Sequence, residues 1–459
     1  MKNYTPSLKS SLNFTYPLVL SNLLNVMGSF FGMYLIAGLG HNALAAGALI
    51  YSVYGMYMTL ILSFLIPISI VIGRVFGSGN LKEIGSVVRQ GLFFALFLSI
   101  PCIIFMRCVY PILIFFHQPT ASSLLVAQYF NGMSYSVIPF LLLLVLTQFI
   151  IGIGKPLLSM VVVALGLPVG LVLSYGLLFG KLGMPNLGIV GAADASVVTA
   201  WLSLIGLFLY LFLNRQFRLY DFSIFKKITD FVWMRQFCTI GWPIAVQRGA
   251  EMLAFSVLTL MMGLVGDFAL AAQQIVLQFV MLAMMIPFSF SQAGGVLVGY
   301  AVGQNDYAKA RAESYSCVFL GVFFAILIGI CFVVLPKHLI HFYSHQSANI
   351  SVENLSVVLF QISAVTLLFD TIRNIAIGVL RGFYDTVYPM IVGVCACWVV
   401  GIPMAYWFGF MMHWGAPGIS LGFMMSIIVS ALLVMHRLHK QSASSAPVVL
   451  NDEAEGVNV

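Results

Sequence analysis

Two pairs of oppositely charged residues lie inside long apolar stretches of the chain. Arg248 and Glu251 are three residues apart in one stretch, and Asp370 and Arg373 are three residues apart in another. This spacing places the two members of each pair on one face of a helix. An ionisable side chain is costly to hold within a membrane, so each of the four is a candidate for function. The chemistry open to Glu251 and Asp370 is the binding of Na⁺ or a proton.

The composition around these charges is typical of a membrane protein. Of the 459 residues, 61% are hydrophobic and 8% are charged, whereas soluble chains have about 45–50% and about 25%. These values exclude a soluble enzyme, a disordered chain and a collagen-like fibre. The net charge of +7 does not indicate nucleic-acid binding, because no dense basic stripe lies beside interleaved aromatic residues.

The apolar stretches are long enough to cross a membrane, which takes about 20 residues. Prolines inside five of them predict kinks, at Pro67, Pro139, Pro168, Pro287 and Pro403. We expect twelve spans, at residues 14–38, 47–76, 91–116, 124–151, 157–180, 188–214, 238–266, 271–302, 315–343, 355–380, 388–412 and 415–436.

The basic residues predict the orientation of these spans. Twelve spans place 16 Lys and Arg residues on the side of the two termini, and only Arg107, Lys181 and Lys337 on the other side. Because basic residues collect in cytoplasmic loops, both termini are expected in the cytoplasm. On this topology Glu251 lies roughly 20 Å, and Asp370 roughly 16 Å, from the cytoplasmic ends of their spans at ~1.5 Å per residue.

The two halves of the sequence repeat one another at a single fixed offset. When Pro17 is aligned with Pro243, Gly73 meets Gly299 and Gly77 meets Gly303 without a gap. Six spans separate the copies, so both copies have the same orientation. Repeats of this kind are found in secondary transporters, whose site lies between the repeats.

The repeat predicts the domain organisation of the chain. The expected parts are a cytoplasmic N-terminus at 1–11, an N-lobe at 12–214, a basic cytoplasmic linker at 215–236, a C-lobe at 237–440 and a disordered cytoplasmic tail at 441–459. The expected fold is an all-α membrane protein with twelve transmembrane helices in two pseudo-symmetric six-helix lobes.

Several short motifs follow one another along the chain over about residues 12–440. They are Ala43-Leu44-Ala45-Ala46, Arg89-Gln90-Gly91, Gly152-Ile153-Gly154-Lys155-Pro156, Ala271-Ala272-Gln273-Gln274-Ile275 and Leu380-Arg381-Gly382. Together they resemble the NorM-like branch of the multidrug and toxic-compound extrusion (MATE) family. The resemblance implies cation-coupled drug antiport by two lobes that open alternately to the two sides of the membrane.

The resemblance also implies roles for particular residues. The family uses a Glu in span seven and an Asp in span ten as its C-lobe cation site, and Glu251 and Asp370 match these positions. We therefore expect them to couple Na⁺ or H⁺, with no other metal or cofactor. The usual acid of span one is replaced by Gly32, and a Tyr common in span ten is replaced by Thr366.

Three further charges are candidates for modulating the site. Arg248 and Arg373 lie one turn nearer the cytoplasm than the acids, which suggests a four-charge cluster with a formal sum of zero. Such arginines would oppose proton binding, and they would also suit a substrate with an anionic group. Alternatively, each arginine pairs locally or snorkels for folding alone. Asp194 is the third charge; a position at a helix N-terminus, where a carboxylate is favoured, would also account for it.

Polar side chains near the acids are candidates for lining a substrate cavity. Gln274 and Gln278 recur at helical spacing in span eight, and Thr366 lies one turn before Asp370. Hydrogen bonding between helices would explain the glutamines equally well.

These features together predict a secondary antiporter of a cell inner membrane. It would export small cationic or amphiphilic compounds in exchange for Na⁺ or H⁺. The alternative is a flippase or exporter of lipid-linked oligosaccharides or of another lipid-type substrate, from the same superfamily. The sequence has no HExxH, GxSxG or P-loop motif, so neither an enzyme nor an ATP-driven pump is expected. The expected partners are small molecules and the bilayer, for a monomeric protein that binds no nucleic acid.

Overall fold

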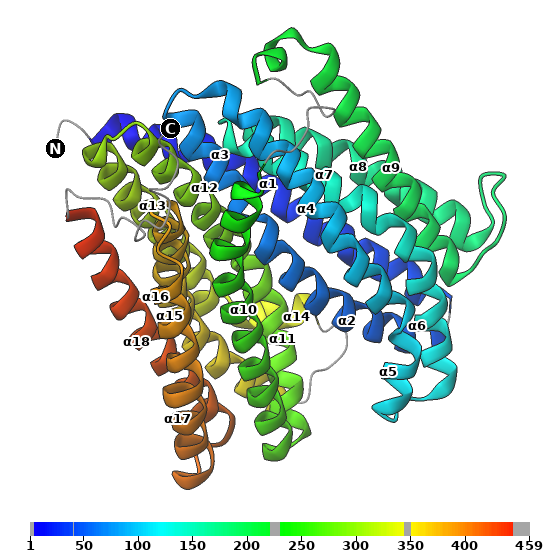
Figure 1. Cartoon of the computed structure of the whole chain (residues 1–459). Helices are drawn as coiled ribbons and strands as arrows, with labels where there is room; N and C mark the ends of the chain where they lie inside the picture. Colours follow the sequence, from blue (N-terminus) through cyan, green and yellow to red (C-terminus); the bar gives the residue numbers. More distant parts are fainter. Residues whose placement is uncertain (1–3, 40, 221–229, 344–349, 444–459) are drawn as a thin grey trace.

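The computed structural model describes residues 4–39, 41–220, 230–343 and 350–443, and within these residues every regular element is a helix (Figure 1). Among these described residues, twelve helical segments are long and apolar enough to cross a membrane. The predicted number of spans and the all-α class are therefore confirmed.

The part of the first half that the structure describes forms nine α-helices and two 3₁₀ segments. They are α1 (Tyr4–Ala37), α2 (His41–Leu65), α3 (Pro67–Gly77), α4 (Leu81–Arg107), α5 (Val109–Phe115), α6 (Thr120–Met133), η1 (Ser134–Ser136), α7 (Val137–Gly152), α8 (Pro156–Phe179), α9 (Ile189–Leu213) and η2 (Arg215–Tyr220).

The second half has a matching set of helices. The eleventh of the twelve spans contains two π-helical segments. The elements of this half are α10 (Val232–Val265), α11 (Asp267–Ala283), α12 (Met285–Gly303), α13 (Tyr307–Val334), α14 (Pro336–Tyr343), α15 (Ile350–Gly382), α16 (Val387–Cys395), η3 (Ala396–Gly401), α17 (Ile402–Tyr406), η4 (Trp407–Met411) and α18 (Gly415–Ala443).

Proline explains where several spans are divided. Pro67 begins α3 directly after α2, and Pro287 lies at the start of α12 after α11. Pro403 lies between the π-helical segments η3 and η4. A proline ring removes one backbone donor and crowds the preceding turn, so these positions interrupt a regular helix. By contrast, α8 runs through Pro168 as a single helix.

Two predicted spans are displaced along the chain. The third was expected at 91–116 but follows α4 from Leu81 to Arg107, and the ninth was expected at 315–343 but follows α13 from Tyr307 to Val334. The first turns of both helices contain charged residues, so a search for apolar stretches does not include them in the span. The apolar residues beyond each helix form the short helices α5 and α14 instead.

The sequence repeat is also a repeat of structure. At the offset that aligns Pro17 with Pro243, the first residues of α2, α4 and α9 align with the first residues of α11, α13 and α18. Even the short helices α5 and α14 occupy equivalent places after α4 and α13. The parallel arrangement of two six-helix repeats is therefore confirmed.

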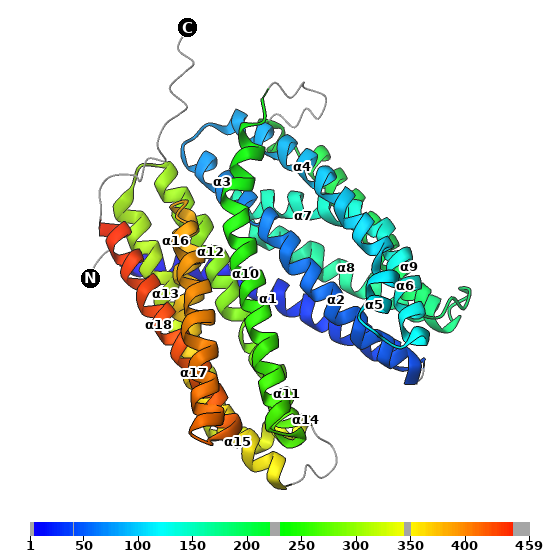
Figure 2. The ribbon, with the colours of Figure 1, turned by 60° about the horizontal axis from the view of Figure 1, so that its bottom comes forward.

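The two halves converge at one end and diverge at the other. In Figure 2 they meet near α3 and α10, and they splay apart toward α17 on one side and α6 on the other. The first helix of each half crosses to the other half: α1 packs on α12 and α13, and α10 packs on α2. Phe14 and Leu18 of α1 share an apolar cluster with Ala293 and Val296 of α12.

Glycines allow the two halves to touch where they converge. A Cβ atom on Gly77 of α3 would overlap the carbonyl oxygen of Tyr300, and a Cβ on Gly303 of α12 would overlap that of Arg74. These two glycines are equivalent positions of the repeat. Helices whose facing residues are small can approach to backbone contact, so α3 and α12 form a close pseudo-symmetric contact.

The predicted domain boundaries fall partly outside the described residues. Of the expected linker, 221–229 lies outside them, and α10 already begins at Val232 within the predicted range. Of the expected tail, 444–459 lies outside them, while α18 continues to Ala443. The division into an N-lobe and a C-lobe at these residues stays a prediction.

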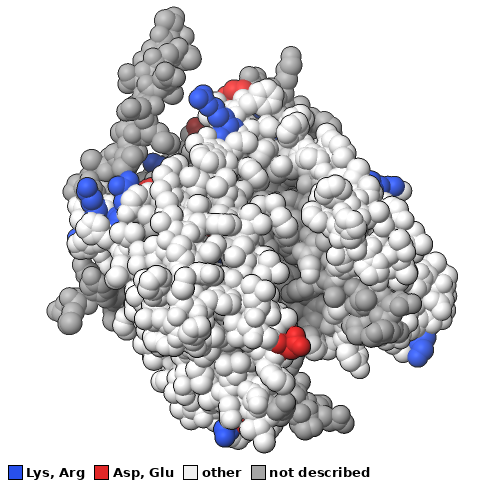
Figure 3. Space-filling view, turned by 90° about the horizontal axis from the view of Figure 1, so that it is seen from below, with Lys and Arg blue, Asp and Glu red and all other residues white. Residues whose placement is uncertain are grey.

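Charged side chains are sparse on the end of the molecule where the halves diverge. Seen from that end, the surface is almost wholly uncharged, with Lys and Arg only at its margins (Figure 3). This distribution agrees with the few basic residues that the predicted topology places on that side.

A candidate cation-coupling site between two helices

The four charged residues expected to act together are contributed by two neighbouring helices of the second half. Arg248 and Glu251 lie on α10, and Asp370 and Arg373 lie on α15. In each helix the three-residue spacing puts acid and base on one face. The structure brings all four side chains into one cluster.

Arg373 is the centre of this cluster. Its Nη1 lies 2.6 Å from the Oε1 of Glu251, and its Nε donates to the Oδ1 of Asp370 at 2.8 Å. The Arg373 side chain is 6% exposed. A buried guanidinium that contacts two carboxylates is held by charge-assisted hydrogen bonds, which are stronger than neutral ones. Glu251 and Asp370 are therefore joined through Arg373.

Arg248 is held less tightly. Its Nη1 lies 3.6 Å from the Oε2 of Glu251, and its Nη2 lies 3.4 Å from the Oδ1 of Asn374. Its guanidinium carbon also lies 4.9 Å from the centre of the Phe288 ring, within the range of a cation–π contact. Arg248 thus has one weak ionic contact and one aromatic contact, and it is more exposed than Arg373.

Two amide side chains complete the hydrogen bonding of the acids. Gln247 donates to the Oε1 of Glu251 at 3.0 Å, and Asn374 donates to the Oδ1 of Asp370 at 2.9 Å. The Oδ2 of Asp370 makes no hydrogen bond to any described residue, and the Oε2 of Glu251 has only the long contact to Arg248. Each acid therefore has one carboxylate oxygen that accepts short hydrogen bonds and a second oxygen that can still bind a cation or a proton.

Packing against two other elements fixes the positions of α10 and α15. Ser291 of α12 donates to the backbone carbonyl of Asn374 at 2.7 Å, which holds α15 beside the cluster. Trp398 of η3 donates to the backbone carbonyl of Ala250 at 3.2 Å, next to Glu251. The π-helical turn of η3 thus faces α10 at the charged site, and such turns are frequent at functional sites.

Arg381 is a charged residue of this region that the apolar pattern does not reveal. The pattern predicts a cytoplasmic loop position for it, because apolarity ends at Leu380, yet α15 continues to Gly382 and buries it to 6% exposure. Its Nη2 has no hydrogen-bond partner among the described residues. Arg381 interacts electrostatically with Arg248 and Glu251. The four expected residues sum to zero by themselves, and with Arg381 the formal sum of the charges in this region becomes +1.

The other predicted residues lie outside the cluster. Asp194 is in the second turn of α9, where its carboxylate faces Gly132 of α6. It is therefore not in the first turn, where the helix-terminus explanation would place it. Gln274 and Gln278 lie on an exposed face of α11. Thr366 is on α15 one turn before Asp370, and its hydroxyl donates to the carbonyl of Ile362 at 2.9 Å.

The donor set of the cluster suits a hard cation. Na⁺ prefers oxygen ligands, as do other hard cations. Glu251 and Asp370 offer one carboxylate oxygen each with spare capacity, and Gln247 and Asn374 add amide oxygens nearby. A proton could be accepted by the same carboxylate oxygens. The positive charge between the acids is already supplied by Arg373, so an incoming cation competes with it.

A family model described as MatE matches residues 17–176 and 243–407 of the chain. The two matched segments cover both repeats and more than half of the sequence. The chain belongs to the MATE family. It is accordingly a multi-pass membrane transporter of small molecules and not an enzyme.

The sequences of curated relatives support the same family assignment. The chain is 30% identical over 431 residues, 93% of each chain, to "Multidrug resistance protein NorM" of Burkholderia vietnamiensis. It is 28% identical over 433 residues, 94% of each chain, to "Probable multidrug resistance protein NorM" of a Synechocystis strain.

The solved structures share the fold at lower identity. The outward-facing conformation of a multidrug resistance MATE family transporter superposes with a TM-score of 0.86 at 16% identity, over 96% of both chains. A MOP superfamily transporter from Pyrococcus furiosus, described as having a binding pocket of reverse polarity, has a TM-score of 0.85 at 16% identity, over 96% of both chains. These likenesses support the arrangement of helices and not the charges of the site.

Proposed function

We propose that the protein is a secondary antiporter that exports small cationic or amphiphilic organic compounds in exchange for Na⁺ or H⁺. Family membership supports transport, and the curated relatives named as multidrug resistance proteins support drug export. The charge cluster on α10 and α15 supports coupling to a cation. Glu251 and Asp370 are the proposed coupling residues.

The observation that carries this proposal is the position of Arg373 between two acids that each keep one oxygen with spare capacity. A cation or a proton at either carboxylate weakens its attraction to Arg373. The acids belong to different helices, so this attraction also ties α10 to α15. Cation binding is thereby coupled to the relative position of the two helices, as linkage requires.

The arrangement of the halves supports alternating access. The contact of α3 with α12 closes the end where the halves converge, and the other end is splayed (Figure 2). With both termini in the cytoplasm, this is the state open to the outside. The proposed location is the inner membrane of a cell, and the proposed active form is a monomer.

A second candidate function is export of an anionic lipid-linked oligosaccharide. Arg381 favours it, because a buried guanidinium nitrogen with no hydrogen-bond partner among the described residues would donate to an anionic group. The two acids beside Arg373 favour the first candidate, since they would repel an anion. We therefore place drug export first.

Expression in an efflux-deficient bacterial host separates the two candidates. For drug export, the wild-type protein raises resistance to cationic dyes such as ethidium, and Glu251→Gln and Asp370→Asn abolish the gain. Glu83→Gln, an exposed acid on α4, serves as the matched control and retains it. Unchanged susceptibility to every cationic dye, with normal amounts of protein in the membrane, would contradict drug export.

A further inference from the structure

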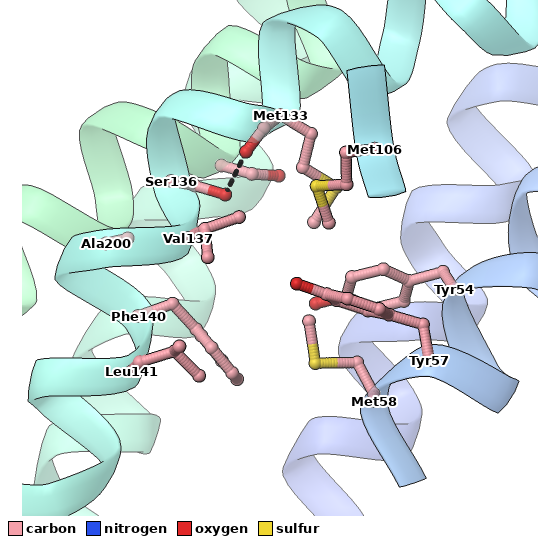
Figure 4. A pocket seen from close by; sticks show the side chains of 11 residues that line it. Tyr54, Tyr57, Met58, Met106, Met133, Ser136, Val137, Phe140, Leu141 and Ala200 are labelled. Carbon is pink, nitrogen blue, oxygen red and sulfur yellow. Dashed lines mark hydrogen bonds between the residues drawn. The ribbon is translucent and has the colours of Figure 1, made fainter. Parts of the chain in front are cut away.

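A cavity of about 110 Å³ lies inside the first half, away from the charge cluster. Its walls come from α2, α7 and α9, together with the ends of α4 and α6 (Figure 4). It is only partly enclosed. None of its lining residues belongs to α10 or α15, so the cation site does not account for it.

The lining of this cavity is aromatic, sulfur-rich and uncharged. Two tyrosines of α2 extend into it, and their hydroxyl groups point toward α7 (Figure 4). Phe140 of α7 faces them. Three methionines add polarizable sulfur, which makes favourable contacts with aromatic rings. The residues named here are Tyr54, Tyr57, Phe140, Met58, Met106 and Met133.

The Tyr57 hydroxyl is buried and only weakly paired. Its residue is 8% exposed, and no nitrogen or oxygen of the described residues accepts or donates a hydrogen bond at its oxygen. The Cys102 thiol pairs with it, but a thiol is a weak hydrogen-bonding group. A buried hydroxyl without a good partner is unfavourable. An oxygen acceptor in the cavity would therefore compete with the thiol for this hydroxyl.

The position of this hydroxyl is fixed by the surrounding side chains. The Tyr57 ring is stacked on Phe105, with 5.7 Å between ring centres and 7° between planes. Across the cavity, the Ser136 hydroxyl donates to the carbonyl of Met133 at 2.7 Å. The Ser196 hydroxyl likewise donates to the carbonyl of Ala192 at 3.0 Å. Both serine hydrogens are thus engaged, which leaves the two tyrosines as donors for an incoming group, and of these Tyr57 is the one held by ring stacking.

We propose that this cavity binds one neutral aromatic ring that carries a hydrogen-bond acceptor. Its enclosed volume of about 110 Å³ is smaller than the about 150 Å³ of an apolar cavity that binds benzene, so it takes at most one ring, part of which would lie in the open side. Its opening leaves room for a substituent. The absence of a charged side chain among its lining residues selects against a charged ligand, whose burial would be costly. The Tyr57 hydroxyl donates to the acceptor.

This site goes beyond the proposed antiport and does not depend on it. It can be tested by binding alone, with purified protein in nanodiscs and ¹⁹F NMR. The probe is 4-fluoroacetophenone, whose carbonyl is a strong acceptor. The comparison probe is 4-fluoro-α-methylstyrene, which has nearly the same shape but a methylene group in place of that oxygen.

The wild-type protein is expected to bind both probes saturably and the ketone more tightly. Ala200→Phe adds a ring inside the cavity, where Ala200 is a lining residue, and is expected to abolish saturable binding of both probes. Ala200→Ser, which leaves most of the space open, is the matched control and is expected to retain binding. Equal signals from wild-type and Ala200→Phe nanodiscs would overturn the site.

Tyr57→Phe tests the hydrogen bond without changing the shape of the cavity. Its ring keeps the stacking on Phe105, so the protein is expected to fold even if Ala200→Phe does not. We expect the affinity for the ketone to fall about tenfold, as loss of a buried hydrogen bond implies, and that for the styrene to change less than about twofold. An equal change for both probes would overturn recognition by Tyr57.

Discussion

The Nη1 of Arg373 lies 2.6 Å from the Oε1 of Glu251, although the two residues are 122 positions apart in the chain. The same guanidinium also binds Asp370 on its own helix, at 2.8 Å. Arg373 is therefore a tie between α10 and α15 as well as the counter-charge of both acids. Any change that weakens this tie alters both the charge at the site and the packing of the two helices.

Arg373→Ala is expected to lower the stability of the protein. The substitution leaves two partly buried carboxylates without their main counter-charge, and breaking a buried ion pair costs about 3–5 kcal/mol. Thermal unfolding in detergent should show a clearly lower Tm than that of the wild-type protein. Arg311→Ala removes an exposed arginine of α13 and should leave the Tm nearly unchanged. Equal Tm values for the wild-type protein and Arg373→Ala would show that the tie contributes nothing.

Arg381→Gln is expected to strengthen cation binding. It removes one positive charge from a cluster whose formal sum is +1. At an effective dielectric constant near 20 the interaction of two charges in one such region is on the order of 1 kcal/mol, so the affinity for the coupling cation should rise about fivefold. Titration of purified protein with Na⁺, and separately with acid, measures this change. Arg311→Gln is the control, and an unchanged or lower affinity in Arg381→Gln would argue against an electrostatic role.

Gly77→Ala and Gly303→Ala are expected to open the contact between α3 and α12. Each added methyl group would overlap a backbone carbonyl oxygen of the facing helix, so the closed arrangement becomes less favourable. A reporter cysteine at Val296, which is buried against α3, should react several-fold faster with a membrane-impermeant thiol reagent. The native cysteines are replaced for this measurement.

The control for the glycine substitutions is Gly263→Ala, because no atom lies within 4 Å of the added methyl group at that position. Its reporter should react at the wild-type rate. If Gly77→Ala and Gly303→Ala also react at that rate, the glycine contact does not control access to this side.

The general architecture could be predicted from sequence because apolarity determines it. Twelve long apolar stretches predict the spans, and the glycines and prolines that recur at one fixed offset predict the repeat. The position of α4 and α13 could not be predicted in this way, since each helix begins with charged turns such as Lys82-Glu83 and Lys309-Ala310-Arg311. Helix formation continues beyond the apolar stretch, and apolarity does not detect that continuation.

The site was only partly predictable for a related reason. The three-residue spacing indicates that Arg248 and Glu251 share a face, as do Asp370 and Arg373, but it does not show that Arg373 crosses to Glu251. That contact depends on the packing of α10 against its neighbours. Arg381 escaped prediction because it follows the last apolar residue of its span, and only tertiary packing buries it.

Transport by purified protein in proteoliposomes tests the central claim most directly. A Na⁺ gradient and a pH gradient are imposed separately, and the movement of ethidium is followed. We predict that one of the two gradients drives ethidium uphill in the wild-type protein, that Glu251→Gln and Asp370→Asn abolish this, and that the exposed-acid variant Glu83→Gln retains it. Uphill transport by Glu251→Gln and Asp370→Asn at the wild-type rate, under either gradient, would contradict the assignment of these acids as the coupling site.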